Sequence, residues 1–588
     1  MKKALALLLA LVMVLSLFAG CGGTTESAAP AESAASAVES AAAPEEAPAV
    51  EEAPAEEASV VEEASVVEEE VAEEEKGPFV AAPATNLPLA DGEVLTYFTE
   101  LPGYMSMFNV NSYDDLEVHQ KAEEMTGVDI EFIIVNNESM DTNFQLMVAS
   151  GDLTDLISGG SQQYASTEAM IEDGVAIDLM EYQDQLPNFW AALEHYSDYK
   201  TVAINQNGQM PEIICISDDY YVQGGLQIRK DWLDEQGMEV PTTYDELHDA
   251  LAMFVSEYGA DHALLMQGSC QMSGLSIIGG MGTTGYATDD TSNMYIKDGV
   301  VRNGFLDEEY KEYMQMITEW YNEGLINSGF ATESSDPWTS NADAYIAGGN
   351  TGVWVAQADN IDKNTASGLE LGDENFEIAG MAEPTIDGEK FHFGSNSTGA
   401  NAMGKNISIS DCCENVELAC AYLDFYFTKD GIELANYGIE GVSMSRDENG
   451  NGYLNDTVLN NPEFPMVSFA TTYYTLACAA TLADFDRMFR NYSEANLAAM
   501  EMWTNTQDDL YTMPSSVELD YDQSTRYSEL WSDINTLAAT EVFKFVMGEY
   551  NFEEDWDNFI NTLKEMGLEE CIEIYQDAYD NYCEAYGL

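Results

Sequence analysis

A run of 57 residues near the N-terminus, from 22 to 78, sets the first limit on how this chain can fold. It consists almost entirely of Ala, Glu, Pro, Ser and Val, with 17 Glu, one Lys and no aromatic residue. Such a segment buries too little apolar surface to offset the entropy lost on ordering. Its Val-Val-Glu-Glu repeats favour transient helix, but like charges at i,i+4 oppose it. We therefore predict a disordered acidic tether, about 40 Å across as a coil, ahead of a folded body.

The twenty residues before this run have the pattern of an export signal. Lys2 and Lys3 form a basic start, and an almost unbroken apolar stretch follows from 4 to 18. That stretch suits a signal peptide and is short for a membrane span. The small residues before Cys21 resemble the bacterial lipobox, although Phe18 stands where Leu is usual.

A lipobox implies that residues 1–20 are removed and that Cys21 receives diacylglycerol. The alternative is an ordinary secretory signal followed by an incidental cysteine. We expect residues 21–78 to comprise the lipidated cysteine and the tether. The protein would then be held by lipid on the extracytoplasmic face of a bacterial cell membrane, with the tether spacing the folded body from it.

Composition bounds the number of lobes and the class of partner. About 510 residues follow the tether, more than one core usually holds, so we expect two or more lobes. The net charge of −87 excludes nucleic acid and anionic lipid faces as partners, because both are bound through basic patches. Eight cysteines remain besides Cys21, without a CxxC spacing. Disulfides are permitted outside the cell, but no pairing is predicted.

Strand-like apolar runs alternate with helical patterns over the folded body. Strands are predicted at 92–98 and 129–135, and a helix, a glycine turn and a strand at 143–158. Thr243 and Glu246 form a capping box that opens another helix. Further helices, each with one apolar face, are predicted for segments that end at Gly127 and Gly324 and for 416–427. This alternation predicts an α/β fold with largely parallel sheets.

A series of short motifs along the chain is typical of one protein family. FQLMVASGDLTDLI at 144–157 has Thr154 where an ASGDLPD motif has Pro, and GLQIRKDWLDEQGMEVPTTYDEL at 225–247 has Tyr244 where a P-x-T-W-D-E-L motif has Trp. Further matching segments lie, in order, at 174–182, 298–332, 352–355, 436–441 and 557–582. Together, over about 90–588, they resemble the extracellular solute-binding proteins of bacterial ABC transporters, family 1, in its carbohydrate-binding large lipoprotein branch. Each motif alone is weak, and their order carries the resemblance.

The resemblance implies a periplasmic-binding-protein-like fold, in which two α/β lobes are joined by a hinge and hold ligand in the cleft between them. Lobe one would comprise 90–220 plus 398–450, and lobe two 223–396 plus 456–588. The chain would cross near 218–225, 392–400 and 445–460. Ligand contacts to both lobes favour the closed state, which a transmembrane permease recognises. No catalysis, cofactor or metal is expected, and we expect a monomer.

The candidate ligand-binding residues are chosen because sugar sites combine aromatic platforms with carboxylates and amides. The first is Trp354, which matches the position where the maltose-binding relative stacks a sugar ring; core packing is the open alternative. Trp338, in a polar loop, either lines the cleft or covers a surface. For the remaining candidates packing is the favoured alternative: Tyr104, Gly160, Ser161, Tyr221, Tyr437, Glu440, Tyr473 and Trp503.

Several other chemistries find little support in the sequence. The stretch 399–406 nearly fits a P-loop, but Asn406 stands where Ser or Thr must meet Mg²⁺. No HExxH or G-x-S-x-G motif occurs, which argues against a zinc or serine hydrolase. The loop at 447–456 begins like a Ca²⁺ loop with Asp447, but Val458 replaces the bidentate Glu, so an Asn-Gly hairpin turn is favoured. The 107 acidic residues leave a carboxylate pair for glycoside hydrolysis open.

Two functional hypotheses follow. The leading one is a receptor that captures a carbohydrate, expected to be an oligosaccharide, and delivers it to an ABC transporter permease. The alternative is a surface-attached carbohydrate-active enzyme or adhesin. The sequence does not identify the ligand, and it leaves peptides and other solutes open.

Overall fold

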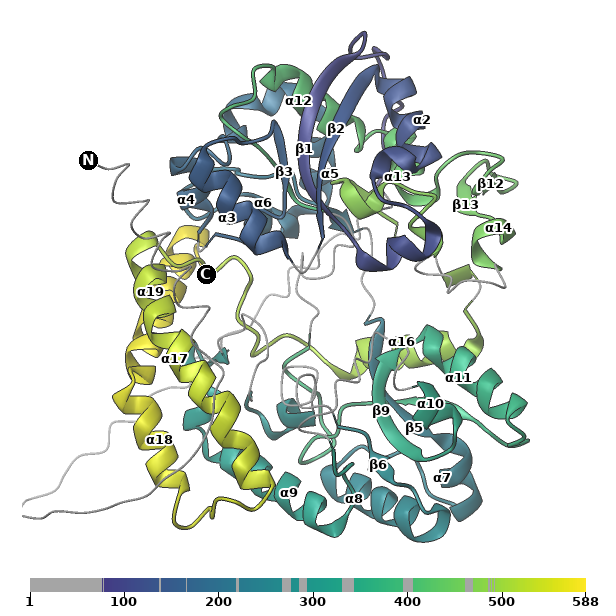
Figure 1. The fold of residues 1–588 in the computed structure, drawn as a ribbon, viewed down its shortest axis with the longest axis vertical. Helices are drawn as coiled ribbons and strands as arrows, with labels where there is room; N and C mark the ends of the chain where they lie inside the picture. Colours follow the sequence, from purple (N-terminus) through teal and green to yellow (C-terminus); the bar gives the residue numbers. More distant parts are fainter. Residues whose placement is uncertain are drawn as a thin grey trace, which may run out of the picture. The chain divides into compact units, whose positions relative to one another are not determined.

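The computed structural model describes residue 77 and residues 79–136, 139–164, 166–217, 222–266, 277–284, 293–329, 343–394, 405–460, 469–484, 487, 489–490 and 492–588. The predicted leader, Cys21 and nearly all of the predicted tether lie outside the described residues. Two four-stranded sheets organise the rest, one in each lobe (Figure 1).

The sheet of lobe one has the strand order β11-β3-β1-β2. It is built from β1 (Glu93–Leu101), β2 (Val128–Asn136), β3 (Leu156–Ser158) and β11 (Ile407–Ile409). β1 runs parallel to β2 and β3, whereas β11 is antiparallel to β3. The first three strands fall where the sequence predicts them.

The helices of lobe one cover this sheet. They are α2 (Glu117–Thr126), α3 (Met140–Ser150), α4 (Thr167–Glu172), α5 (Pro187–His195), α6 (Lys200–Ala203), α12 (Val416–Phe425) and α13 (Lys429–Tyr437). α2 ends at Gly127 as predicted, with a φ of 69° that favours glycine. A Cβ there would also lie 2.1 Å from the Ala90 carbonyl oxygen, so the turn requires glycine for two reasons.

The sheet of lobe two has the order β10-β5-β9-β6. Its strands are β5 (Gly224–Arg229), β6 (His262–Leu264), β9 (Thr351–Gln357) and β10 (Ile378–Met381). β5 is antiparallel to both β9 and β10, and only β6 and β9 pair in parallel. The prediction of largely parallel sheets is therefore wrong for this lobe. β5 and β11 are the first strands that the chain forms after passing from one lobe to the other, so neither follows the βαβ rule that sets parallel direction.

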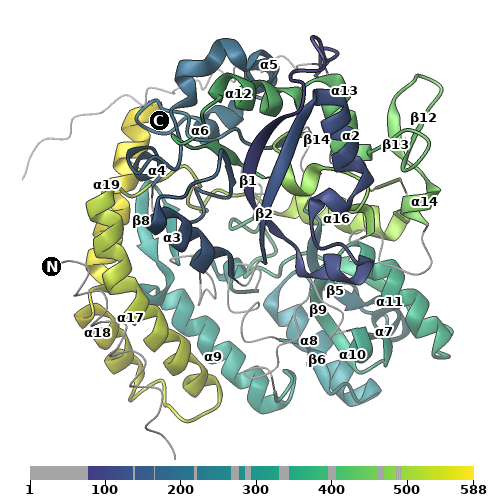
Figure 2. The same cartoon turned by 45° about the horizontal axis from the view of Figure 1, so that its top comes forward.

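The helices of lobe two pack around its sheet and around one another. They are α7 (Lys230–Gln236), α8 (Tyr244–Met253), α9 (Glu308–Glu323), α10 (Asp343–Ala347), α11 (Asp359–Glu370), α16 (Glu494–Thr506), α17 (Tyr521–Val546), α18 (Trp556–Glu565) and α19 (Leu568–Tyr586). α8 begins with the predicted capping box, and α9 ends at Gly324 as predicted. α17, α18 and α19 lie side by side in two views (Figure 2), and their buried faces join the core of lobe two.

Residues 444–460 and 469–484 pack with lobe one. The hairpin β12 (Met444–Arg446) and β13 (Gly452–Leu454) leads to α14 (Asp456–Leu459), and β14 (Leu482–Ala483) pairs in parallel with β4 (Ile216–Ser217). Leu454, Val458 and Ala483 share one buried cluster with Cys215 and Tyr437. The family resemblance predicts that the chain from 456 onward belongs to lobe two. In the structure the chain first returns to extend β4, and α16 is the next element that packs on the second sheet.

Three absences apply to the described part of the chain. Its cysteines at 412, 413, 420, 478, 571 and 583 are free thiols. No group of three or more His, Cys, Asp or Glu side chains within it could hold a metal ion. None of its helices is both long and apolar enough to span a bilayer.

Candidate functional site

A pocket of about 330 Å³ lies between lobe one and residues 507–520, the link that joins α16 to α17. Side chains with hydroxyl, amide or carboxyl groups line it from lobe one: Ser161, Gln162, Tyr164, Ser166, Thr167, Asn205, Glu212 and Asn406. Residues 515–518 of the link line the opposite side. The Leu519 side chain, at the end of the link, is buried in the core of lobe two, so both lobes contribute to this pocket.

The turn after β3 shapes one wall of the pocket. Gly159 has a φ of 68°, and its N–H donates to the Asn406 carbonyl 3.0 Å away. A Cβ on Gly160 would lie 2.7 Å from the Met170 side chain, with Glu212 also close at 3.5 Å. Two adjacent glycines thus let the chain turn tightly and bring the backbone N–H of Ser161 to the Glu212 carboxyl, at 3.2 Å.

Two buried carboxyl groups from distant parts of the chain line the pocket. Burial raises the pKa of Glu212, against the hydrogen bonds that it accepts from Ser161. Burial also raises the pKa of Glu518, whose carboxylate accepts hydrogen bonds from the N–H and hydroxyl of Thr167 at 3.3 and 2.9 Å. Asn205 in turn donates its amide to the Thr167 hydroxyl at 3.1 Å. The lining therefore presents fixed hydrogen-bonding groups, which suit a ligand rich in hydroxyls.

Further hydrogen bonds join the lobes around this pocket. Gln206 donates its side-chain amide to the Glu518 carbonyl at 3.3 Å. The Tyr586 hydroxyl, at the end of α19, donates to the Ile204 carbonyl at 2.6 Å. The link and the last helix of lobe two therefore contact the same segment of lobe one.

A second pocket, of about 300 Å³, continues along the link. It shares Thr201, Val202, Ser515 and Ser516 with the first pocket. The aromatic side chains of α19 add to its lining through Tyr579 and Tyr582. The two pockets are therefore neighbours along residues 509–518.

A small third pocket, of about 60 Å³, lies in lobe two where β5 begins. Aromatic rings line it, from Phe391, Phe393 and Trp503, together with the carboxyl group of Glu383. Gln507, the first residue of the link, also lines it. The link therefore contributes to all three pockets.

The predicted site residues separate into groups in the structure. Ser161 lines the interlobe pocket, and Gly160 precedes it in the turn after β3. Trp354 is 1% exposed and donates its indole N–H to the Gln227 side chain at 3.2 Å, within a core cluster that also contains Trp503. Trp503 donates to the Met381 carbonyl at 3.0 Å and reaches the third pocket. Trp338 and Tyr221 lie outside the described residues.

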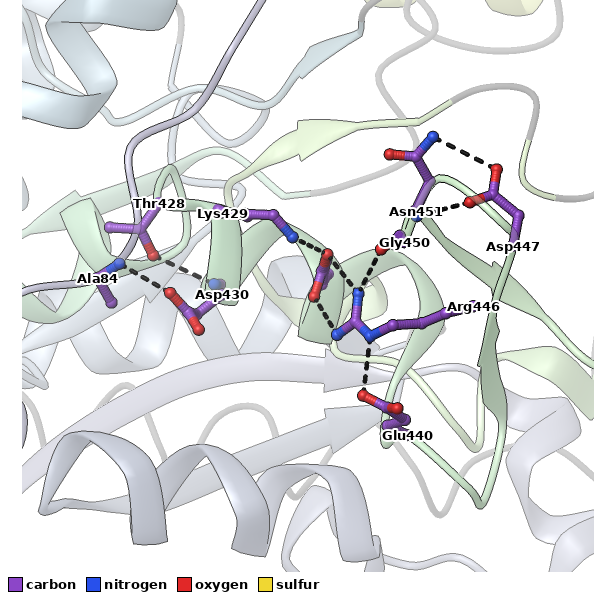
Figure 3. A network of polar contacts seen from close by, with 11 residues as sticks. Ala84, Thr428, Lys429, Asp430, Glu440, Arg446, Asp447, Gly450 and Asn451 are labelled. Carbon is purple, nitrogen blue, oxygen red and sulfur yellow. Dashed lines mark hydrogen bonds and ion pairs between the residues drawn. The ribbon is translucent and has the colours of Figure 1, made fainter.

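The remaining predicted residues lie away from the interlobe pocket. Tyr437 and Tyr473 belong to the buried cluster around α14. Glu440 forms an ion pair with Arg446 at 2.9 Å (Figure 3). Tyr104 lies on a 3-10 turn after β1, 37% exposed, and partial burial raises the pKa of its phenol. No ligand tests these residues, so their role in binding stays a prediction.

The predicted hairpin at 447–452 is confirmed. β12 and β13 pair antiparallel. The Asp447 carboxylate accepts hydrogen bonds from the backbone N–H of Asn449 at 2.8 Å and from that of Asn451 at 2.8 Å (Figure 3). This is an Asx turn, in which the side chain folds onto its own loop. The Asp447 carboxylate thereby stabilises the hairpin.

Of the residues that line the pocket, the sequence prediction contains only Ser161; Thr167, Asn205, Glu212 and Glu518 are among those it missed. Glu212 and Glu518 are two of 107 acidic residues, and neither lies in a recognisable motif. A Pro precedes Glu212 and a Pro-Ser-Ser sequence precedes Glu518, which signals only a turn. Their proximity arises from the fold.

Comparison with known proteins identifies the family. The family model described as "Bacterial extracellular solute-binding protein" matches residues 111–433, more than half of the chain. The chain belongs to this family. Its members are the solute receptors of ABC transporters and are not enzymes. The expected family and its mixed α/β binding-protein fold are thereby confirmed.

Three curated relatives are similar over long stretches. The polygalacturonan/rhamnogalacturonan-binding protein YtcQ of Bacillus subtilis is 19% identical, over 78% of this chain and 87% of its own. The fructooligosaccharide ABC transporter substrate-binding protein FusA of Streptococcus pneumoniae is 22% identical, over 84% of this chain and 91% of its own. Lipoprotein LipO of Bacillus subtilis is 23% identical, over 54% and 62%. The structure of FusA in complex with kestose matches the fold with a TM-score of 0.64, at 18% identity over 84% of this chain and all of that one.

Proposed function

We propose that this protein is a membrane-anchored extracytoplasmic receptor that captures an oligosaccharide between its lobes and delivers it to the permease of an ABC transporter. The interlobe pocket carries the proposal. Its hydroxyl, amide and carboxyl groups come from both lobes, so a bound ligand would contact both. A ligand with such contacts stabilises the closed arrangement of the lobes over the open one.

The shape of the site supports a ligand longer than one sugar ring. The first two pockets share four residues and together follow residues 509–518 of the link. Tyr579 and Tyr582 line the second pocket, and aromatic side chains in such sites can pack on the apolar faces of sugars. Two relatives carry polysaccharide or oligosaccharide ligands in their names. An oligosaccharide fits these observations better than a single small solute.

The anchor is proposed from the sequence. Cys21 follows a signal-like stretch and precedes the acidic tether. The relative LipO is named a lipoprotein. A tether of this length would keep the folded body near a permease while letting it reorient.

A ligand screen on the mature chain tests the proposal. We expect one or more neutral oligosaccharides, such as kestose or nystose, to raise the Tm in a thermal-shift assay. Calorimetry would then give the affinity, and chromatography after prolonged incubation would show the ligand unchanged. Replacing Asn205 by Ala removes an amide from the pocket and should weaken binding about tenfold.

The control for this screen is Asn449→Ala, in the hairpin of lobe one that is remote from the pocket lining. It should leave the affinity unchanged. Cleavage of a stabilising oligosaccharide would favour the surface-attached enzyme instead. A chain that no oligosaccharide stabilises would contradict the proposed ligand class.

A further inference from the structure

The three pockets along the link contain carboxyl groups and no cationic side chain. Glu212 and Glu518 line the first, Asp509 the second and Glu383 the third. No Lys, Arg or His lines any of them. Every Lys, Arg and His after residue 76 lies among the described residues. The undescribed segments that follow residue 76 therefore supply no cation to the site.

Most of the cations next to lining residues along the chain have acidic partners. The exception is Lys297, next to Ile296 of the second pocket, whose ammonium lies 5.1 Å from the centre of the Tyr511 ring. Lys405, next to the lining residue Asn406, forms an ion pair with Glu100. His392 and Lys390 contact the carboxylate of Asp508 in the link, at 2.7 and 3.9 Å. A ligand carboxylate would have to compete with these acidic groups for them.

Backbone donors that could bind an anion are also occupied. The N–H of Thr167, at the first residue of α4, donates to the Glu518 carboxylate at 3.3 Å. The N–H of Ser161, in the glycine turn, donates to the Glu212 carboxylate at 3.2 Å. Helix starts and tight turns are places where proteins bind carboxylates or phosphates of ligands. Here the chain places its own carboxylates there.

The third pocket has an acceptor oxygen that no protein group uses. The Glu383 Oε2 atom is buried and accepts no hydrogen bond from the protein. The lining rings of Phe391, Phe393 and Trp503 surround it with apolar surface. A buried carboxyl oxygen without a donor favours a hydroxyl or ammonium group nearby, and rings present a face that attracts cations.

We propose that this site takes uncharged or amine-bearing oligosaccharides and rejects oligosaccharides of uronic acids. The proposal rests on the proposed function and narrows its ligand class. A uronate carboxylate in the first pocket would meet two carboxyl groups with no compensating cation, and like charges placed together are a strong source of discrimination. The chain would thus differ in ligand charge from its relative YtcQ, which is named for binding polygalacturonan.

A charge-sorted panel of oligosaccharides tests the proposal by calorimetry on the mature chain. The panel contains kestose and nystose as neutral sugars, chitosan trimers as amines, and trigalacturonate beside its methyl ester, which has the same rings without the charge. We expect the tightest acidic member to bind more than tenfold more weakly than the tightest neutral or amine member. An acidic member within tenfold of the best would overturn the proposal. A panel in which nothing binds would instead contradict the proposed function itself.

A double variant then locates the source of the discrimination. Glu212→Gln with Glu518→Gln keeps the shape of the first pocket and removes both charges. We expect the affinity of the acidic sugars to rise by about tenfold relative to the neutral ones. The control is Glu389→Gln, an exposed residue that lines none of the three pockets. If the double variant keeps the native Tm and its ratio of acidic-sugar to neutral-sugar affinity is unchanged, Glu212 and Glu518 are not the source of the discrimination.

Discussion

At the residue scale, the burial of Glu383 changes its pKa and so makes the stability of the protein depend on pH. Burial raises the pKa of Glu383 to about 8, whereas an unfolded chain has a Glu pKa of about 4.3. Between these values the folded chain holds a proton that the unfolded chain has released. The unfolded state therefore binds fewer protons, and the free energy of unfolding falls as pH rises through this window.

Replacing Glu383 by Gln should remove this pH dependence, because Gln resembles the protonated acid and never ionises. At pH 9 we expect the variant to be more stable than the native chain by on the order of 3 kcal/mol. At pH 4 the variant and the native chain should have nearly equal free energies of unfolding. Urea unfolding at both pH values measures the difference. Glu389→Gln, on the exposed part of the same segment, should show no such pH dependence, and a Glu383 variant that behaves like it would disprove the buried ionisation.

The residues of the interlobe pocket could be predicted from sequence only in part. Gly160 and Ser161 can be proposed from sequence because they directly follow a predicted strand. In α/β folds, ligands bind near the carboxyl ends of strands. Thr167 and Glu518 are 351 residues apart and meet only through the folded chain. Trp354 was chosen from a family position, and its ring packs in the core of lobe two. Its role in binding stays a prediction, because no local pattern distinguishes a buried aromatic from a ligand platform.

At the scale of elements, one arginine holds the hairpin β12–β13 to lobe one. Arg446 pairs through two nitrogens with Glu433 of α13, at 2.8 and 3.0 Å, and through Nε with Glu440 at 2.9 Å (Figure 3). It also donates to the Gly450 carbonyl at the hairpin turn, at 3.0 Å. A helix, a loop and a hairpin thus meet at one guanidinium group, whose planar donors suit such a junction.

Arg446→Met should loosen this hairpin while leaving the rest of lobe one folded. The side chain is 31% exposed, so solvent screens its ion pairs, and we expect a loss of only about 1 kcal/mol in the free energy of unfolding. Amide hydrogen exchange should quicken at 444–454 and spare β1 and β2. The matched control is Arg526→Met, which breaks a comparable exposed ion pair with Glu570 in lobe two. Unchanged exchange in the hairpin would show that Arg446 does not hold it.

Most helices and strands could be predicted from the sequence. The parallel or antiparallel direction in which the strands pair could not. The ends of helices such as α2, α8 and α9 are set by nearby residues, either a capping box or a terminal glycine. Local sequence patterns are therefore enough to predict where these helices begin or end. The direction of β5 and the pairing of β14 with β4 depend on where the chain passes between lobes. That passage is a property of the whole fold. For the same reason, the predicted crossing between lobes near 445–460 comes too early in the chain. Residues up to Ala483 still pack with lobe one.

At the scale of the whole molecule, the proposed anchor would link the folded body to the membrane through the acidic segment that precedes the body. One acyl chain binds a bilayer only reversibly, whereas the two chains of a diacylglycerol hold a protein stably. The body carries a strong negative charge, so an anionic membrane would repel it and the tether would extend. The proposal therefore expects attachment to depend on the lipid at Cys21, with no contribution from the surface of the body.

Cys21→Ser should release the protein from membranes. We expect the native chain, expressed in a bacterium that processes lipoproteins, to sediment with membranes and to resist extraction by salt, because salt screens charge and leaves acyl chains in place. The variant should appear in the soluble or secreted fraction with an unchanged Tm, since the substitution lies outside the folded body. Cys583→Ser, a free cysteine on α19, is the matched control and should stay with the membranes. A Cys21 variant that still sediments would mean that another part of the chain provides the attachment.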